Sequence, residues 1–209
     1  MNDTVILVHG LWMPGIKLYY LGWKLKRRGF NVRYFRYRSM LGCINVSARS
    51  LFDNVEAIEQ GKVHLVGYSL GGIVAARMME EYPSDRLCRV ALLGCPLQGS
   101  VVAEFLAGTP LGRFMLGSVA VEGIVRRRPI LMRQSGVLVV AGTLPLGIGL
   151  ALGLPFPHDG TVSISETFLD GAANVRVLGS HFSLVFSPRV ADTIAAFFLH
   201  ESDLAEIST

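Results

Sequence analysis

Cysteine is scarce in this chain of 209 residues: only Cys43, Cys88 and Cys95 occur, and they are far apart. So few and scattered cysteines exclude a disulfide framework and a cysteine-based metal site. We expect all three to be reduced, as in a cytoplasmic protein, because disulfides rarely persist in that compartment. The first residues also lack a basic segment followed by a long apolar run, so the sequence predicts no secretory signal peptide.

Charge is sparse as well. Charged side chains make up 17% of the residues, and the formal net charge is only +4. The two short basic clusters, Lys26–Arg28 and Arg126–Arg128, lack the density of a nucleic-acid-binding groove. We therefore expect no nucleic-acid partner. The clusters are interpreted as solvated faces, with attraction to an anionic lipid or substrate as the alternative.

One long stretch, Val137–Pro157, has no charged residue at all. Its length would suit a membrane-spanning helix, but it contains four glycines and three prolines. Such frequent helix breakers are incompatible with one continuous helix. The stretch instead predicts a short buried strand at Val137–Ala141, followed by an apolar loop.

Apolar residues are abundant, at 51% of the chain, and form short runs that alternate with longer amphipathic segments. The predicted strands are Val5–Val8, Val32–Tyr37, Val63–Gly67, Val90–Gly94, Val137–Ala141 and Val175–Leu178. The predicted helices are Ile16–Arg28, Val46–Gln60, Leu70–Tyr82 and Pro188–His200. This alternation predicts an α/β fold, a mostly parallel sheet of roughly six strands flanked by helices, in one domain over residues 1–209. Ligands of such sheets bind beyond the carboxyl ends of the strands.

The segment Pro96–Gln134, between the fourth and fifth predicted strands, is too long for an ordinary loop. It contains helical pieces with large apolar residues such as Phe105, Leu111 and Phe114. Two interpretations stay open. The segment is either a helical hairpin packed on the core, or a cap or lid that gives a binding site an apolar wall.

The segment GYSLG at Gly67–Gly71 fits the pattern G-x-S-x-G between a predicted strand and a predicted helix. In this setting the pattern is typical of a nucleophile elbow, a sharp turn that presents its serine at the end of a sheet. Glycine is favoured on both sides because it has no Cβ to clash where strand and helix meet. A serine hydroxyl needs a base before it can attack, so the pattern predicts partners for Ser69. The alternative is a glycine-rich turn without a catalytic role.

The partners of such a serine follow it in the order acid, then histidine. Three histidines come after Ser69. His200 lies in the predicted closing helix, and His158 is adjacent to Asp159. His181 directly follows the last predicted strand, at the end of the sheet from which a base can reach the serine. We expect His181 to be the base.

The acid must lie between Ser69 and His181, where the candidates are Asp85, Glu104, Glu122, Asp159, Glu166 and Asp170. Asp159 follows the apolar loop after the fifth predicted strand and so belongs to the same end of the sheet. A buried aspartate there would orient the imidazole and stabilise its charged form. We expect Asp159 to be the acid, with Asp170 as the alternative.

A developing oxyanion needs two N–H donors. The first predicted donor is Leu70, which directly follows the serine. The second is Leu11, with Trp12 as the alternative, because the glycine in VILVHGLW lets the chain turn toward the site. His9 is predicted to brace this loop rather than to act as a base. Trp12 and Met13 are also predicted to contact an apolar substrate.

Four segments together resemble the α/β-hydrolase superfamily, and more narrowly its small bacterial lipases and esterases. VHGLW resembles their oxyanion motif, GYSLGG their elbow, HDGTVS their acid loop and LDGAANVRVLGSHFSLVFSP their terminal histidine segment. Together with the strand that leads into VHGLW, these segments run from Val5 to Pro188 and cover nearly the whole chain. The resemblance implies the minimal form of the fold, with Pro96–Gln134 as an insertion and candidate lid.

The residues and the resemblance predict a serine hydrolase of carboxylic esters that uses Ser69, His181 and Asp159 and needs no cofactor or metal ion. Its expected partner is a small-molecule ester or a lipid, with transient contact to a membrane surface as a further expectation. Two alternatives stay open. One is a thioesterase or acyltransferase with the same catalytic residues, and the other is a non-catalytic lipid-binding protein of the same fold.

Overall fold

The computed structural model describes residues 3–11, 18–126, 129–130 and 136–199. Six strands form one sheet in the order β2-β1-β3-β4-β5-β6, and every neighbouring pair is parallel. The strands are β1 (Thr4–Val8), β2 (Asn31–Phe35), β3 (Val63–Tyr68), β4 (Leu87–Leu93), β5 (Val137–Gly142) and β6 (Ala173–Val177). The predicted six-stranded parallel sheet is therefore confirmed.

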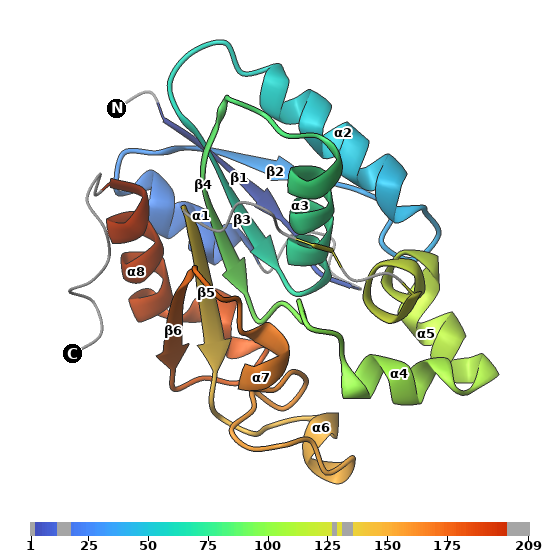
Figure 1. Cartoon of the computed structure of the whole chain (residues 1–209). Coiled ribbons are helices and arrows are strands. Elements are labelled where there is room, and N and C mark those ends of the chain that lie inside the picture. The colour runs from blue at the N-terminus through green and yellow to red at the C-terminus, as the bar shows by residue number, and fades with distance from the viewer. Residues whose placement is uncertain (1–2, 12–17, 127–128, 131–135, 200–209) are drawn as a thin grey trace.

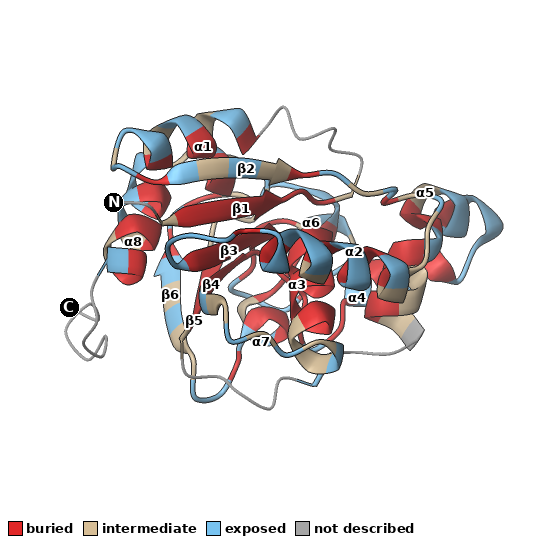
Figure 2. Cartoon of the chain, turned by 90° about the horizontal axis from the view of Figure 1, so that it is seen from above, coloured by how far each residue is buried: buried red, intermediate tan, exposed pale blue. Residues whose placement is uncertain are grey.

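Helices cover both faces of this sheet (Figure 1). The helices packed on the sheet are α1 (Tyr19–Lys26), α2 (Ile44–Glu56), α3 (Leu70–Glu81) and α8 (Pro188–Leu199). Successive residues of a strand point to opposite faces. In β3, Leu65 therefore belongs to the core under α2 and α3, and Val66 to the core under α1 and α8. With helices on both faces, the inner strands β1 and β3 are buried, whereas the edge strands β2 and β6 are partly exposed (Figure 2).

Helix α2 differs from its predicted extent of Val46–Gln60. It begins at Ile44, where the backbone N–H donates to Glu122 Oε2 at 3.0 Å. This carboxylate lies far along the chain, so the local sequence carries no signal of the cap it provides. The helix ends at Glu56, before the positive-φ turn at Gly61 that the prediction used as its stop.

The predicted helical character of the Pro96–Gln134 insertion is confirmed by α4 (Val101–Ala107), α5 (Pro110–Ala120) and a π-helical segment, Val121–Arg126. Their inward residues, including Ala103, Leu116 and Val119, join the core under α2 and α3. The arrows of β3, β4 and β5 point toward the end of the molecule where α4, α5 and α6 lie (Figure 1). Whether the insertion acts as a lid stays a prediction.

The uncharged stretch consists of β5 and a loop, as predicted, but the loop also contains the short helix α6 (Ile148–Ala151). A second short helix, α7 (Ile164–Thr167), follows. Its N-terminus is capped by a capping box between Ser163 and Glu166. Within the described ranges, no helix is long and apolar enough to cross a membrane. All three cysteines are free.

Candidate active site

Ser69 lies in the sharp turn between β3 and α3. Its backbone has φ 52° and ψ −123°, and it is the one non-glycine residue with a positive φ in the described part of the chain. A side chain makes this conformation costly, so the surrounding structure must impose it. The neighbour Gly71 shows how closely the elements meet, since a Cβ there would collide with the carbonyl oxygens of Val8 and His9. The predicted sharp corner is therefore present, and it holds Ser69 beside the loop that follows β1.

Three side chains predicted to act together form a continuous series of hydrogen bonds. His181 Nε2 lies 3.0 Å from Ser69 Oγ, and His181 Nδ1 lies 2.7 Å from Asp159 Oδ2. The Asp159 side chain is 1% exposed, whereas that of His181 is 14% exposed. The other carboxylate oxygen, Oδ1, accepts the backbone N–H groups of Thr161 at 2.9 Å and Val162 at 2.8 Å. Both oxygens of this buried carboxylate are thus occupied, and its orientation is fixed.

Each member of the series follows a different strand of the parallel sheet. Ser69 follows β3, Asp159 lies in the loop after β5, and His181 comes shortly after β6. The backbone N–H of His181 also donates to the Asp159 carbonyl at 2.8 Å, so the two loops are joined directly. The carboxyl ends of neighbouring parallel strands meet at one edge, which explains why residues so distant in sequence converge here.

Two residues that support His181 were not singled out from the sequence. The Tyr68 hydroxyl donates to the His181 carbonyl at 3.0 Å, and burial raises the pKa of this phenol, which keeps it a neutral donor. Gly94, directly after β4, has φ +55°, and a Cβ there would lie 3.0 Å from His181 Nδ1 and 3.2 Å from Asp159 Oδ2. A glycine directly after a strand is the only local signal of this close approach.

The remaining acid candidates have other contacts. Glu166 accepts the N–H of Val101 at the start of α4 at 2.6 Å, and Glu122 caps α2. Asp170, the predicted alternative, is exposed and accepts the N–H of Gly171 in its own turn. Asp85 and Glu104 lie on the surface. Of the six carboxylates considered, the structure brings Asp159 to the histidine.

Two other histidines of the described residues, His9 and His158, have contacts away from the serine hydroxyl. The His9 ring stacks on Tyr37 with centroids 4.5 Å apart, and the Tyr37 hydroxyl donates to the His9 carbonyl at 2.9 Å. Burial lowers the pKa of His9, so its imidazole is held neutral. These contacts brace the loop after β1, as the sequence predicted. His158 directs Nδ1 at Gly160, and His200 lies outside the described residues.

The predicted oxyanion donors come from the two elements that meet at the serine. Leu70 is the first residue of α3, and N–H groups in the first turn of a helix have no acceptor within that helix. A Cβ on Gly10 would lie 3.1 Å from Ser69 Cβ, so the loop containing Leu11 passes directly beside the serine. Leu70 thus directly follows Ser69, and the loop that carries Leu11 lies against the serine, while the role of both amides as oxyanion donors stays a prediction. Trp12 and Met13 lie outside the described residues.

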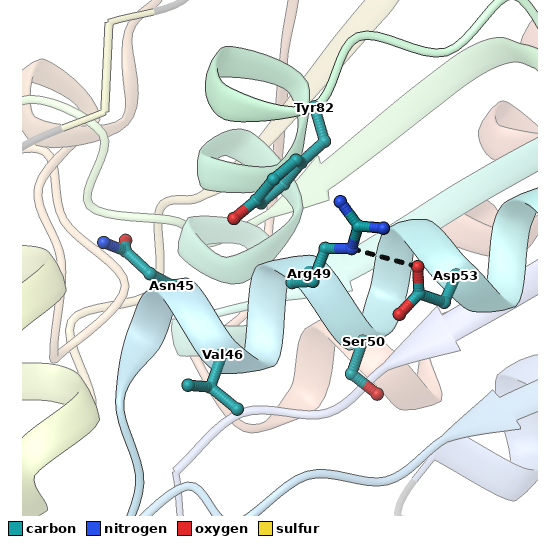
Figure 3. Close-up of a pocket in the computed structure, with 6 residues that line it drawn as sticks. All are labelled: Asn45, Val46, Arg49, Ser50, Asp53 and Tyr82. Carbon is teal, nitrogen blue, oxygen red and sulfur yellow. Dashed lines mark hydrogen bonds and ion pairs between the residues drawn. The ribbon is translucent and has the colours of Figure 1, made fainter.

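A separate hollow lies on the surface of α2 and is shown in Figure 3. Its lining is Asn45, Val46, Arg49, Ser50, Asp53 and Tyr82. The guanidinium of Arg49 bonds Asp53 at 3.1 Å and lies over the ring of Tyr82, 5.3 Å from its centroid. Tyr82 caps the carboxyl end of α3, whereas Ser69 is at its amino end, so this hollow is distinct from the serine site.

Similar solved structures include a lipase, a carboxyl esterase and a phospholipase. A lipase from Bacillus licheniformis, BlEst2 in mature form, is 21% identical with a TM-score of 0.69, over 94% of this chain and 91% of that one. The metagenomic carboxyl esterase MGS0156 is 16% identical with a TM-score of 0.68, over 94% and 75% of the two chains. Phospholipase PlaB from Legionella pneumophila is 16% identical with a TM-score of 0.76, over 96% and 59%. At such identities these likenesses show a shared fold.

A search of curated proteins found no matching sequence. The model of the alpha/beta hydrolase family matches residues 5–206, which include the whole sheet except Thr4, the first residue of β1, and all three hydrogen-bonded side chains. The parallel sheet of six strands agrees with the minimal form of that fold. The chain therefore belongs to the alpha/beta hydrolase family.

Proposed function

We propose that this protein is a serine hydrolase that cleaves carboxylic esters through an acyl-enzyme. The observation that carries the proposal is the series of hydrogen bonds from Ser69 Oγ through the His181 imidazole to Asp159. An imidazole so placed can take the hydroxyl proton as Oγ attacks the ester carbonyl. The buried carboxylate holds the Nδ1–H tautomer and stabilises the imidazolium that forms.

The reaction then proceeds in two halves. Backbone N–H groups of Leu11 and Leu70 stabilise the negative charge on the former carbonyl oxygen, and the positive end of the α3 dipole favours the same charge. The C–O bond to the alcohol breaks, and His181 gives that alcohol the proton it took from Ser69. Water, deprotonated by the same imidazole, releases the acid and restores the serine. Apart from the ester and the water molecule, every group in this scheme belongs to the chain itself, and the scheme requires no cofactor.

An apolar acyl group or lipid is the proposed substrate class. Large apolar side chains are exposed on segments that follow the carboxyl ends of β4 and β5: Phe105, Leu111, Phe114, Leu146, Ile148, Leu150 and Phe156. Exposed apolar residues grouped on the active-site side favour an apolar ligand or a transient contact with a membrane surface. Trp12 and Met13 stay proposed substrate contacts, and the insertion is proposed to form one wall of the site.

The first test measures initial rates on p-nitrophenyl esters of increasing acyl length, with wild type beside Ser69→Ala. We expect turnover by wild type, with a preferred length that sizes the acyl pocket, and none by Ser69→Ala. Ser50→Ala, an exposed serine on α2, is the matched control and should behave as wild type. Equal rates for wild type and Ser69→Ala would overturn the proposal.

The same assay distinguishes hydrolysis from acyl transfer. Added alcohol competes with water for the acyl-enzyme, and the ratio of new ester to free acid reports which acceptor the site prefers. We expect free acid to dominate at low alcohol concentration. Predominant ester formation under those conditions would assign the protein to the acyltransferases.

A further inference from the structure

In the turn that carries Asp159, each of the three inward N–H groups has an acceptor. It is closed by an antiparallel bridge between His158 and Ser163. Inside the bridge, the N–H groups of Thr161 and Val162 donate to Asp159 Oδ1. The third amide, that of Gly160, donates at 3.0 Å to His158 Nδ1 rather than to the carboxylate.

His158 is fully buried, and this contact explains why a histidine is present. Because Nδ1 accepts the Gly160 N–H, the proton of the neutral ring is on Nε2. That nitrogen is buried and has no hydrogen-bond partner among the described residues. The ring also contacts Phe156, with centroids 4.6 Å apart. A phenyl ring would fill the same space without burying an unpaired N–H, so the distinctive property of histidine here is its Nδ1 acceptor.

The acceptor matters because Gly160 lies next to the acid. Gly160 is buried, and its carbonyl is held by the Gly149 N–H of α6 at 2.8 Å, so its amide cannot readily turn to solvent. Without an acceptor at position 158, the closest strong acceptor in sequence is the Asp159 carboxylate. An amide that recruits this carboxylate would draw it away from His181.

We propose that His158 is a positioning residue: by accepting the Gly160 N–H through Nδ1, it keeps the Asp159 carboxylate directed at His181. The effect on rate rests on the proposed function, whereas the effect on the Asp159–His181 hydrogen bond does not. His158 itself does not contact Ser69 and takes no proton in the reaction.

Two substitutions separate the acceptor from the ring. In His158→Asn, the side-chain Oδ1 takes the position of Nδ1 but the ring is lost; in His158→Phe, the ring is kept but the acceptor is lost. Positioning through Nδ1 predicts that the Asn variant retains kcat within about twofold. It predicts that the Phe variant loses about tenfold or more in kcat with little change in KM, a part of the ~10⁴-fold lost when a triad histidine lacks the carboxylate that holds its tautomer. The opposite ranking would show that the ring only packs, and would overturn the proposal.

A spectroscopic measurement tests the positioning without any ester. The proton shared by His181 Nδ1 and Asp159 should give a low-field NMR resonance, identified by its loss in His181→Gln. We expect it in wild type and His158→Asn, and shifted or absent in His158→Phe. An unchanged resonance in a folded Phe variant contradicts the proposal, even if wild type hydrolyses no ester. If the resonance behaves as expected in wild type and both variants but wild type hydrolyses no ester, only the proposed function fails.

Thermal unfolding of each variant accompanies both measurements. Should His158→Phe not fold, His158→Leu removes the same acceptor with a smaller, more flexible side chain and takes its place. The proposal is supported if kcat and the resonance are retained in the Asn variant and lost in the Phe or Leu variant. Equal behaviour of the acceptor and non-acceptor variants overturns it.

Discussion

The two ends of β3 show what turns a histidine into a candidate base. Near the amino end, His64 is completely buried, stacks on Phe198 at 4.4 Å and meets Phe30 edge-on, and neither ring nitrogen has a hydrogen-bond partner among the described residues. Beyond the carboxyl end, His181 is partly exposed, and both its ring nitrogens are bonded. Burial among aromatic rings makes His64 a packing residue. A carboxylate on one nitrogen and a hydroxyl on the other give His181 the means to move a proton.

The comparison is tested most strongly by replacing each histidine in turn. His181→Gln should abolish ester hydrolysis, since loss of the histidine from a serine hydrolase lowers kcat by as much as ~10⁶-fold. His64→Phe keeps an aromatic ring in the stack with Phe198 and should leave kcat within about twofold, because it touches no reacting group. Steady-state kinetics on the best ester of the chain-length series measures both variants. Similar losses of kcat in the two variants would mean that the contacts of His181 do not distinguish it functionally from His64.

The same pair differs in how stability depends on pH. Burial, the largest cause, lowers the pKa of His64 to about 4 from its usual 6.5, with Arg89 and Lys62 lowering it further and Asp3 opposing them. As the pH falls, His64 therefore takes up a proton at a higher pH in the unfolded chain than in the folded chain. His64 thus contributes stability above pH 6.5, which is lost as the pH falls through the folded pKa of about 4.

We expect this loss to reach about 3 kcal/mol in the free energy of unfolding, from the size of the shift. Denaturant titrations at about pH 7 and about pH 4 measure it. His64→Phe is the reference, because it removes the titration and retains the ring. Wild type should lose more stability than the variant over this interval. Parallel pH profiles for the two proteins would show that His64 titrates normally in the folded state.

Sequence reasoning succeeded where the signal was local. The strand–turn–helix pattern around Ser69 predicted the sharp turn. The order of the residues along the chain, and their places after the ends of predicted strands, indicated Asp159 and His181, which the structure brings together. It missed contacts made by distant segments. Nothing near Ile44 reveals that Glu122 caps its helix, and nothing in the uncharged loop reveals α6, whose Gly149 N–H donates to the carbonyl of Gly160.

Gly94, which the sequence did not single out, lies against both His181 and Asp159. A Cβ added there would lie 3.0 Å from His181 Nδ1 and 3.2 Å from Asp159 Oδ2, and its φ of +55° is unfavourable for alanine. Gly94→Ala should therefore displace the imidazole or the carboxylate by a fraction of an ångström and lower kcat by about 10- to 100-fold.

The matched control for Gly94→Ala is Gly29→Ala, which also has a positive φ, +91°, but open space around the added Cβ. Both variants bear the backbone strain, and only Gly94→Ala adds the contact with the site. Equal stability losses with a kcat defect confined to Gly94→Ala would locate the effect at the His181–Asp159 bond. Full activity in a folded Gly94→Ala would mean that this bond tolerates displacement, and that the partners of His181 matter more than their exact spacing.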